Sequence, residues 1–306
     1  MDKDFYSLCK KSAQRLQKGY KCSRSQIQTY YEKEFTILEG FFDFSINLGI
    51  SLDRYIPQPQ KPFLQFALLR IQEKALKISR EGKILMENGS ASGAIARWRT
   101  LFEFSVVAKI LVKYPDLAPK YVDYAKIDDY KWARKLVLYK DKLNLCSYNL
   151  DFFPEIETAY NNTKEKYGWS GKDYEWAKNE DIKSPNLFNL AQAVGLEHLY
   201  AYVDEAHKYN HPCTRYLLND RGSKASKDDL QTYLFSPFDM ELPLQLIAIS
   251  LCEVNHATMI GYAQLLSTDS HQLDCNLVLN DKFPATMIEM ITERFRCKGS
   301  MDVDDV

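Results

Sequence analysis

Apolar residues recur along most of this chain at the three- and four-residue spacing of a helix face. Between residues 3 and 18, for example, Phe5, Leu8 and Cys9 occupy positions i, i+3 and i+4, which puts them on one side of a helix. The same period continues in longer segments, and no segment shows the sustained alternation of a half-buried strand. The pattern therefore predicts an all-α protein.

Prolines, glycines and polar runs mark where these helices end. The run PQPQKP at 57–62 cannot be helical, because proline lacks an amide hydrogen and clashes with the preceding turn. NGSASG at 88–93 predicts a turn, and the polar stretches 168–186 and 221–229 predict connections. The expected helices are 3–18, 25–55 with Ser25 as N-cap, 62–88, 94–113, 119–143, 154–167, a short helix opened by Ser184 and ended by Gly195, 197–210, 243–266 and 284–295.

These helices predict one bundle-like core with smaller parts at its two ends. We expect an N-terminal helical extension at 1–60 and a helical core domain at 61–266. A C-terminal helix and a frayed acidic tail are expected at 267–306. The chain shows no internal repeat.

The composition agrees with a folded helical protein and points to no charged partner. Hydrophobic residues make up 45% of the chain and charged residues 26%, a balance that excludes disorder for most of it. Glycine (12) and proline (11) are too few for the many tight turns of a β-sandwich. Lys and Arg (40) nearly cancel Asp and Glu (41), so the chain lacks the basic excess usual for nucleic-acid and membrane-surface proteins.

The seven cysteines are scattered, and none forms a C-x2-C or C-x4-C pair, which excludes zinc ribbons and thioredoxin-like motifs. Unpaired cysteines in a chain of this size indicate a reducing compartment. The N-terminal residues contain no apolar stretch of signal-peptide length. The longest apolar run, 242–266, contains Glu253, Asn255 and His256 and is not expected to span a membrane. We therefore expect a cytoplasmic protein with no membrane partner.

An arginine and a glutamate stand in the otherwise apolar helix expected at 94–113. Arg99 and Glu103 are four residues apart and so share a helix face. Charged groups on a buried helix need a partner or a function, because burying a lone charge is costly. One interpretation is a salt bridge, within this helix or to a neighbour. The other is a polar site in which Arg99 holds an anion and Glu103 acts as base or ligand.

A second candidate group lies at the end of the helix expected at 197–210. Asp204, His207 and His211 share one face, at a spacing that metal ligands also use. Pro212 disfavours the helical conformation for His211, which should therefore stand at the helix C-terminus, held in place as catalysis requires. That geometry spoils a regular histidine pair, so we expect no metal and no other cofactor. Cys213 has no third group beside it and is not favoured as a nucleophile.

Several short motifs occur in an order that resembles an uncharacterised, mainly bacterial family filed as domain of unknown function 5677. The resemblance runs from about residue 62 to residue 216. The motifs are A-x-x-RWRTLFE at 94–103, YVDY at 121–124, GWSG at 168–171, VGLEHLY at 194–200 and HP at 211–212.

Membership of this family would imply an all-helical fold, with the marked polar positions at Arg99, Glu103 and His211. In the family pattern a serine usually stands where this chain has His207. The resemblance implies no established activity, so the roles of these residues have to come from their chemistry.

A weaker resemblance is to the HEPN helical superfamily, whose nucleases use an R-x4-6-H motif at one helix end. Residues 204–206, where that arginine would stand relative to His211, are Asp, Glu and Ala. A nuclease of this type would need Arg99 or Arg97 to substitute from another helix.

Two functional hypotheses follow from these residues. The first is a HEPN-like, metal-independent ribonuclease or toxin-type effector in phage defence. In it His211 is the general acid or base beside His207, Arg99 stabilises charge on phosphorus and Glu103 orients Arg99. The second is a non-catalytic sensor or protein-interaction module in which the same residues form a buried network. The expected partners are RNA or a protein, with a homo-oligomer as a further option.

Overall fold

The computed structural model describes residues 3–55, 62–142, 152–211, 240–264 and 270–299, and every regular element in these ranges is a helix. The predicted all-α fold is therefore confirmed for the described part of the chain. The α-helices are α1 (Lys3–Tyr30), α2 (Glu32–Tyr55), α3 (Phe63–Glu87), α4 (Ala91–Lys113), α5 (Ala118–Tyr139), α6 (Phe153–Tyr167), α7 (Leu187–Ala193), α8 (Tyr200–Asn210), α11 (Glu241–Ala263) and α12 (Ser270–Gly299). Short 3₁₀ turns lie at η1 (Pro115–Leu117), η2 (Glu175–Ala177) and η3 (Glu197–Leu199).

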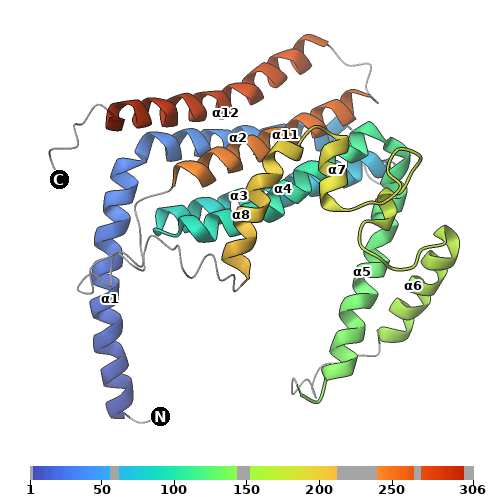
Figure 1. Cartoon of the computed structure of the whole chain (residues 1–306), viewed down its shortest axis with the longest axis horizontal. Helices are drawn as coiled ribbons and strands as arrows, with labels where there is room; N and C mark the ends of the chain where they lie inside the picture. Colours follow the sequence, from blue (N-terminus) through green and yellow to red (C-terminus); the bar gives the residue numbers. More distant parts are fainter. Residues whose placement is uncertain (1–2, 56–61, 143–151, 212–239, 265–269, 300–306) are drawn as a thin grey trace.

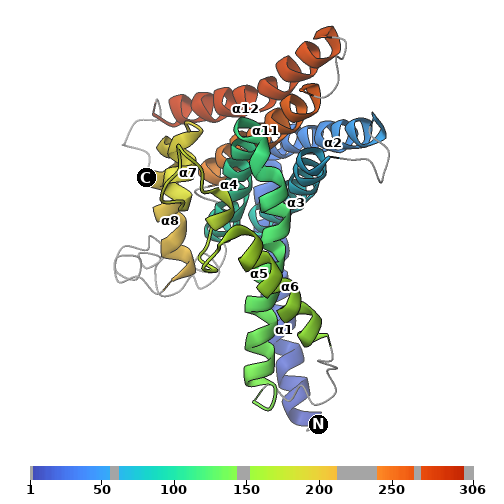
Figure 2. The ribbon, with the colours of Figure 1, turned by 90° about the vertical axis from the view of Figure 1, so that its right-hand side faces the viewer.

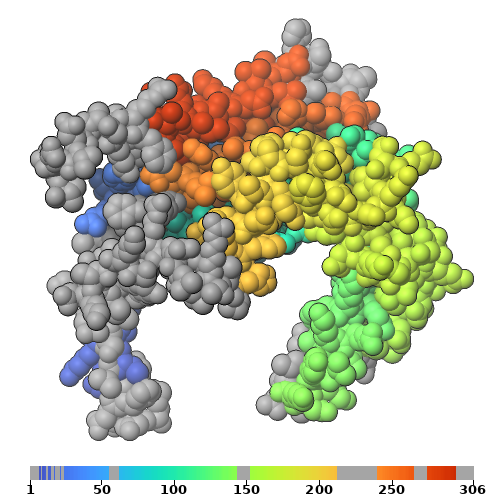
Figure 3. Space-filling view, in the orientation of Figure 1, coloured from blue at the N-terminus to red at the C-terminus, as the bar shows by residue number. Residues whose placement is uncertain are grey.

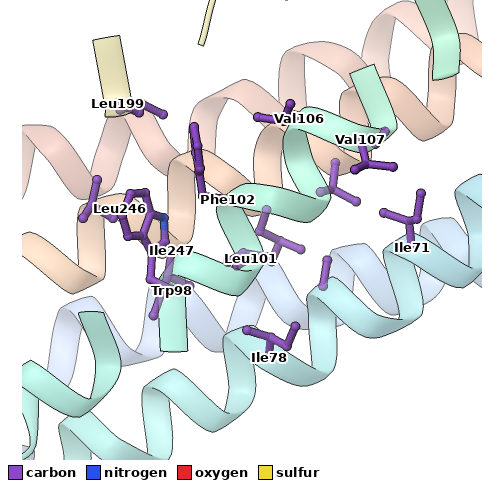
Figure 4. Close-up of a cluster of buried hydrophobic side chains, with 14 of the residues drawn as sticks. Ile71, Ile78, Trp98, Leu101, Phe102, Val106, Val107, Leu199, Leu246 and Ile247 are labelled. Atoms are coloured by element: carbon purple, nitrogen blue, oxygen red, sulfur yellow. The ribbon is translucent and has the colours of Figure 1, made fainter. Parts of the chain in front are cut away.

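Helices α3, α4 and α11 pack against one another at the centre of the molecule (Figure 1). Trp98, Leu101 and Phe102 of α4 are completely buried. Figure 4 shows them in one cluster with Ile247 of α11 and Ile78 of α3. Full burial of each such side chain contributes about 1.5–3 kcal/mol. This interface therefore fixes α4 firmly, and the polar residues of α4 are presented from a rigid helix.

Two helical segments extend away from this core on the same side of the molecule (Figure 1, Figure 2). One is α1, and the other is α5 with α6 folded back along it. Figure 3 shows the α5–α6 pair projecting from the core as an arm. The rings of Tyr130 on α5 and Tyr160 on α6 stack at a centroid distance of 4.0 Å, which holds the two helices together.

A buried network of amides and a hydroxyl joins α2, α3, α11 and α12. Asn255 of α11 donates to the hydroxyl of Ser45 at 2.8 Å and to the amide oxygen of Asn280 at 3.1 Å. The Gln72 amide nitrogen donates to Asn255 at 3.0 Å. All four residues are buried. Losing one of them would leave polar groups of the others without a hydrogen-bond partner, because water cannot reach them. The network therefore fixes how these helices align.

The break between the first two helices lies at Tyr31, and the prediction that Ser25 caps the second helix is wrong. Ser25 is an exposed residue inside α1. The break lies where the chain joins the core, because Ile27 and Tyr31 are both buried and the Tyr31 hydroxyl donates to Glu241 at 2.9 Å. Glu32 and Glu34 then supply the acidic first turn of α2, which the helix dipole favours.

The last helix begins 14 residues before the predicted position, and Pro284 lies inside α12. Proline removes the amide that would bond to the carbonyl four residues earlier, here that of Asn280. The thiol of Cys252 on α11 donates to that carbonyl at 3.8 Å, and the Asn280 side chain donates to the Cys252 carbonyl at 3.1 Å. Packing against α11 thus carries the helix through the proline.

The other predicted boundaries differ by a few residues. Helix α4 begins at Ala91 instead of residue 94. Asn186, not Ser184, caps α7, because its side chain accepts the Asn189 amide at 2.9 Å. Helix α5 ends at Tyr139 instead of residue 143. The predicted loop at 221–229 lies outside the described residues, and the limits of the three predicted domains stay predictions.

Two of the described helices, α2 and α11, are long and apolar enough to cross a membrane by length and composition alone. The apolar window of α11 is 72% buried within the structure, as expected for a core helix, and that of α2 is 33% buried. The cytoplasmic location predicted from the cysteines stays a prediction.

Candidate functional site

Arg99 and Glu103 lie on the face of α4 that the core leaves partly open. Their side chains are 32% and 33% exposed, and Nη1 of Arg99 lies 3.9 Å from Oε2 of Glu103. That separation is longer than a hydrogen bond, so each side chain keeps hydrogen-bonding capacity for other partners. An ion pair with this exposure contributes little to stability.

The direct partner of Arg99 is His207 on α8, which packs against α4. Nε of Arg99 donates to Nε2 of His207 at 2.8 Å. Because a guanidinium can only donate, Nε2 of His207 must carry a lone pair and the imidazole is neutral. Burial lowers the pKa of His207, and the charge of Arg99 lowers it further. The structure thus holds an imidazole in its basic form against a permanent cation.

His211 lies next to this pair, at the position that the sequence predicts. Helix α8 ends at Asn210, and His211 has extended backbone angles (φ −130°, ψ 145°). Its amide donates to the His207 carbonyl at 3.0 Å, and the two imidazole rings are 5.8 Å apart and nearly perpendicular. His211 is exposed, so it can meet a ligand that reaches Arg99 and His207.

The acidic residues described close to the histidines are Asp204 and Glu205. Asp204 is exposed, and its charge acts to raise the pKa of His207, against the larger effects of burial and Arg99. Glu205 forms an ion pair with Lys208 one turn further along α8. Within the described residues, no group of three or more His, Cys, Asp or Glu side chains is placed to hold a metal ion.

Glu103 has a second partner, Tyr174, which sequence reasoning missed. The Tyr174 hydroxyl donates to Oε1 of Glu103 at 2.5 Å. Burial and then the charge of Glu103 raise the pKa of Tyr174 far above its usual value, so the hydroxyl stays a donor. Tyr174 also has a positive φ of 62°, which is uncommon for a residue with a Cβ and is held by its surroundings.

The carboxylate of Glu175 organises the loop that carries Tyr174. It accepts the backbone amides of Ser170, Gly171 and Lys172 and the Ser170 hydroxyl, at 2.5–3.0 Å. Burial acts to raise the pKa of Glu175, but these hydrogen bonds lower it overall. The GWSG motif at 168–171 therefore provides hydrogen-bond donors that bind a carboxylate of the same loop.

Helix α5 fixes the same loop from the other side. The Tyr124 hydroxyl donates to the Lys172 carbonyl at 2.6 Å, and Lys131 forms an ion pair with Asp173 at 2.8 Å. The rings of Tyr121 and Trp176 meet edge to face at 4.8 Å. The motifs at 121–124 and 168–171 thus position Tyr174 against Glu103.

A cleft of about 630 Å³ lies between α3, α4, α5 and the Tyr174 loop. Glu103, one helical turn from Arg99 on α4, and Tyr174 form part of its wall. Two of its lining residues, Ile71 and Val107, also belong to the buried hydrophobic cluster shown in Figure 4. The lining residues are Phe66, Ala67, Arg70, Ile71, Lys74, Thr100, Glu103, Phe104, Val107, Tyr121, Val122, Tyr124, Ala125, Asp128, Asp173, Tyr174 and Trp176.

The predicted site residues are therefore linked by a chain of contacts. Arg99 approaches Glu103 and binds His207, and His207 lies beside His211. The sequence could show their helix faces but not which histidine Arg99 would meet. Only the polar and aromatic character of 168–186 could have pointed to Tyr174. Cys213 lies outside the described residues.

Comparison with known proteins gives a family and nothing more. The model of a family of unknown function, DUF5677, matches residues 65–223, slightly more than half of the chain. No curated protein and no solved structure matches the chain. The matched range contains α4, α5, the GWSG loop and α8, and thus every residue of the site described above.

Proposed function

The chain belongs to the DUF5677 family, and we propose that it is a HEPN-like ribonuclease that cleaves RNA without a metal ion. One observation carries the proposal: a neutral imidazole accepts a hydrogen bond from Arg99, and a second imidazole, His211, lies exposed beside it. Two imidazoles can serve as the general base and the general acid of metal-independent phosphodiester transfer, and a cation can stabilise the charge that grows on the phosphate. The arginine comes from α4 and the histidines from α8, so no R-x4-6-H motif is needed within one helix.

The reaction is an attack of the RNA 2′-hydroxyl on the neighbouring phosphorus atom. A phosphate bound to Arg99 takes over the guanidinium N–H that His207 accepts in the free protein. The lone pair on Nε2 of His207 is then available for the 2′-hydroxyl proton. The new bond joins O2′ to phosphorus, and the bond from phosphorus to O5′ breaks. His211 supplies the proton to O5′, leaving a 2′,3′-cyclic phosphate and a 5′-hydroxyl.

Arg99 and Glu103 contribute charge and position in this scheme. The guanidinium stays protonated and stabilises the negative charge that grows on the phosphate oxygens. Glu103, itself held by Tyr174, keeps the Arg99 side chain directed along α4. An enzyme of this kind would suit a toxin-type effector in phage defence, with cellular RNA as its substrate.

The non-catalytic alternative also has an observation in its favour. In the free protein each charged group of the site already has a neighbour, from His207 through Arg99 and Glu103 to Tyr174. A module that binds a protein partner or senses a ligand could use this chain of contacts as a support.

Incubation of the protein with an end-labelled single-stranded RNA in EDTA distinguishes the two functions. We expect cleavage products with 2′,3′-cyclic phosphate ends, and a loss of rate of about 100-fold or more for His211→Ala or Arg99→Ala. Replacing the 2′-hydroxyls by hydrogen should abolish cleavage, because the nucleophile is missing.

Arg97→Ala is the matched control for Arg99→Ala. Arg97 lies on the same helix and forms its ion pair with Glu81 on α3 at 2.5 Å, away from the histidines. It should keep full activity. RNA that stays intact with folded wild-type protein, or is cleaved equally by wild type and His211→Ala, would refute the ribonuclease proposal.

A further inference from the structure

The cleft beside the site combines aromatic surface with acceptor groups. Phe66, Tyr121 and Trp176 contribute rings to its lining, and Glu103, Asp128 and Asp173 contribute carboxylates. Its volume of about 630 Å³ lies within the usual range of ligand sites, roughly 300–1,000 Å³. Flat rings and carboxylates together suit a planar ligand whose edge carries hydrogen-bond donors.

Two polar groups in this cleft retain hydrogen-bonding capacity. Among the described residues, the Tyr121 hydroxyl takes part in no hydrogen bond to another side chain. Burial and the charges of Glu103 and Asp128 raise its pKa to about 12. Glu103 accepts one hydrogen bond, from Tyr174, and its Oε2 is too far from Arg99 for another. A carboxylate has about four acceptor positions, so most of those on Glu103 are open.

We propose that this cleft binds a guanine base of the RNA substrate, with the Watson–Crick edge of the base towards Glu103 and its ring against the aromatic wall. This inference rests on the proposed ribonuclease function and adds the substrate preference to it. The Tyr121 hydroxyl supplies a further donor or acceptor to the same base.

Guanine matches a carboxylate better than the other bases do. It presents two adjacent donors, N1–H and the 2-amino group, to the two carboxylate oxygens. Adenine and cytosine each present one amino donor beside a ring-nitrogen acceptor, and uracil presents N3–H between two carbonyl oxygens. Each of these three would therefore place an acceptor against the negative charge of Glu103.

The distance from cleft to catalytic groups suits a single nucleotide. Nη1 of Arg99 and Oε2 of Glu103 are 3.9 Å apart, and a hydrogen bond of about 2.9 Å at each end lets them bind groups up to about 10 Å apart. A phosphate at Arg99 and a base beside Glu103 can therefore belong to the same residue of RNA. On α3, Arg70 and Lys74 are exposed at the edge of the cleft, where they can meet the backbone of the neighbouring nucleotides.

Titration calorimetry with single nucleotides tests the cleft separately from catalysis. We expect GMP to bind wild-type protein about tenfold or more tightly than AMP, CMP or UMP. His211→Ala should keep the preference for GMP over the other three nucleotides, because His211 is outside the cleft lining that contacts the base. Tyr121→Phe should weaken GMP binding by about three- to tenfold, the effect of one hydrogen bond. Glu103→Gln should reduce the preference for GMP to about threefold or less.

Tyr130→Phe is the matched control for Tyr121→Phe, since Tyr130 lies on the same helix but outside the cleft lining. It should bind GMP as wild type does. Sequencing of the RNA fragments should place the cleavage sites next to guanines.

The two proposals fail in different ways. Cleavage at sites unrelated to guanine, with no preferential GMP binding, overturns this inference and leaves the ribonuclease standing. Selective GMP binding that depends on Tyr121 and Glu103, with no RNA cleaved, overturns the ribonuclease and supports the guanine site within a sensor. If all four nucleotides bind wild type equally, or Tyr121→Phe binds GMP like Tyr130→Phe, the guanine site is refuted.

Discussion

Replacing Glu103 by alanine distinguishes a functional role of this residue from a structural role in an ion pair. The change removes a hydrogen bond from Tyr174 to a charged acceptor, a contact that contributes about 1.5–3 kcal/mol. It also removes the long contact to Arg99, which contributes about 0.5 kcal/mol or less at this exposure. Water can reach the partly open site and solvate the Tyr174 hydroxyl. We therefore expect a loss of about 1–2 kcal/mol, below the roughly 3–5 kcal/mol for breaking a buried ion pair.

Urea unfolding measures this loss, and RNA cleavage measured on the same preparation gives its effect on rate. Cleavage should fall about tenfold or more, because Arg99 loses its orienting partner. Glu253→Ala is a suitable control: Glu253 pairs with Lys109 of α4 at 2.6 Å, with side chains 25% and 29% exposed. It should cost about 1 kcal/mol or less and leave cleavage unchanged. A loss above about 3 kcal/mol with unchanged cleavage would show that Glu103 is structural and refute this reasoning.

Three further predictions concern the rest of the molecule. Asn280→Ala should lower the free energy of unfolding by about 2–4 kcal/mol in urea, because buried partners lose their hydrogen bonds; a change below about 0.5 kcal/mol would contradict this. Burial acts to raise the pKa of Asp123, but hydrogen bonds lower it overall from 3.8 to about 2. Its stabilisation should thus be present above the unfolded pKa and lost as the pH falls towards 2, so unfolding between pH 5 and pH 2 should depend less on pH in Asp123→Asn. In the native protein, a thiol reagent should modify the exposed Cys9 and Cys275 but not the buried Cys252, whose pKa burial raises; equal reaction rates would contradict it.

Local signals in the sequence were enough for part of the site. Arg99 and Glu103 stand four residues apart on an apolar helix, and this spacing alone places them on one face. His211 precedes a proline, which is enough to set it at the end of α8. Both signals involve residues close together in the chain, so these positions can be predicted without knowledge of the tertiary structure.

Features that depend on distant partners could not be predicted. Pro284 was expected to begin a helix, but α12 continues through it because Asn280 of α12 exchanges hydrogen bonds with Cys252 of α11. Tyr174 reaches Glu103 only because a loop folds around Glu175 and docks on α5. In both cases contacts between residues far apart in the sequence decide the structure. Neither the hydrophobic period nor the capping residues indicate those contacts.

The two polar networks of this protein differ in a way that bears on function. The network around Asn255 is buried on all sides and joins four helices, as a device that fixes helix alignment should. The network around Arg99 is about one-third exposed, holds a neutral imidazole against a cation and borders a cleft. Alignment requires neither an open face nor a histidine with a lowered pKa. A ribonuclease that uses histidine as its base needs an open face for the RNA and an imidazole in its neutral form, and this contrast favours a functional role for the Arg99 network.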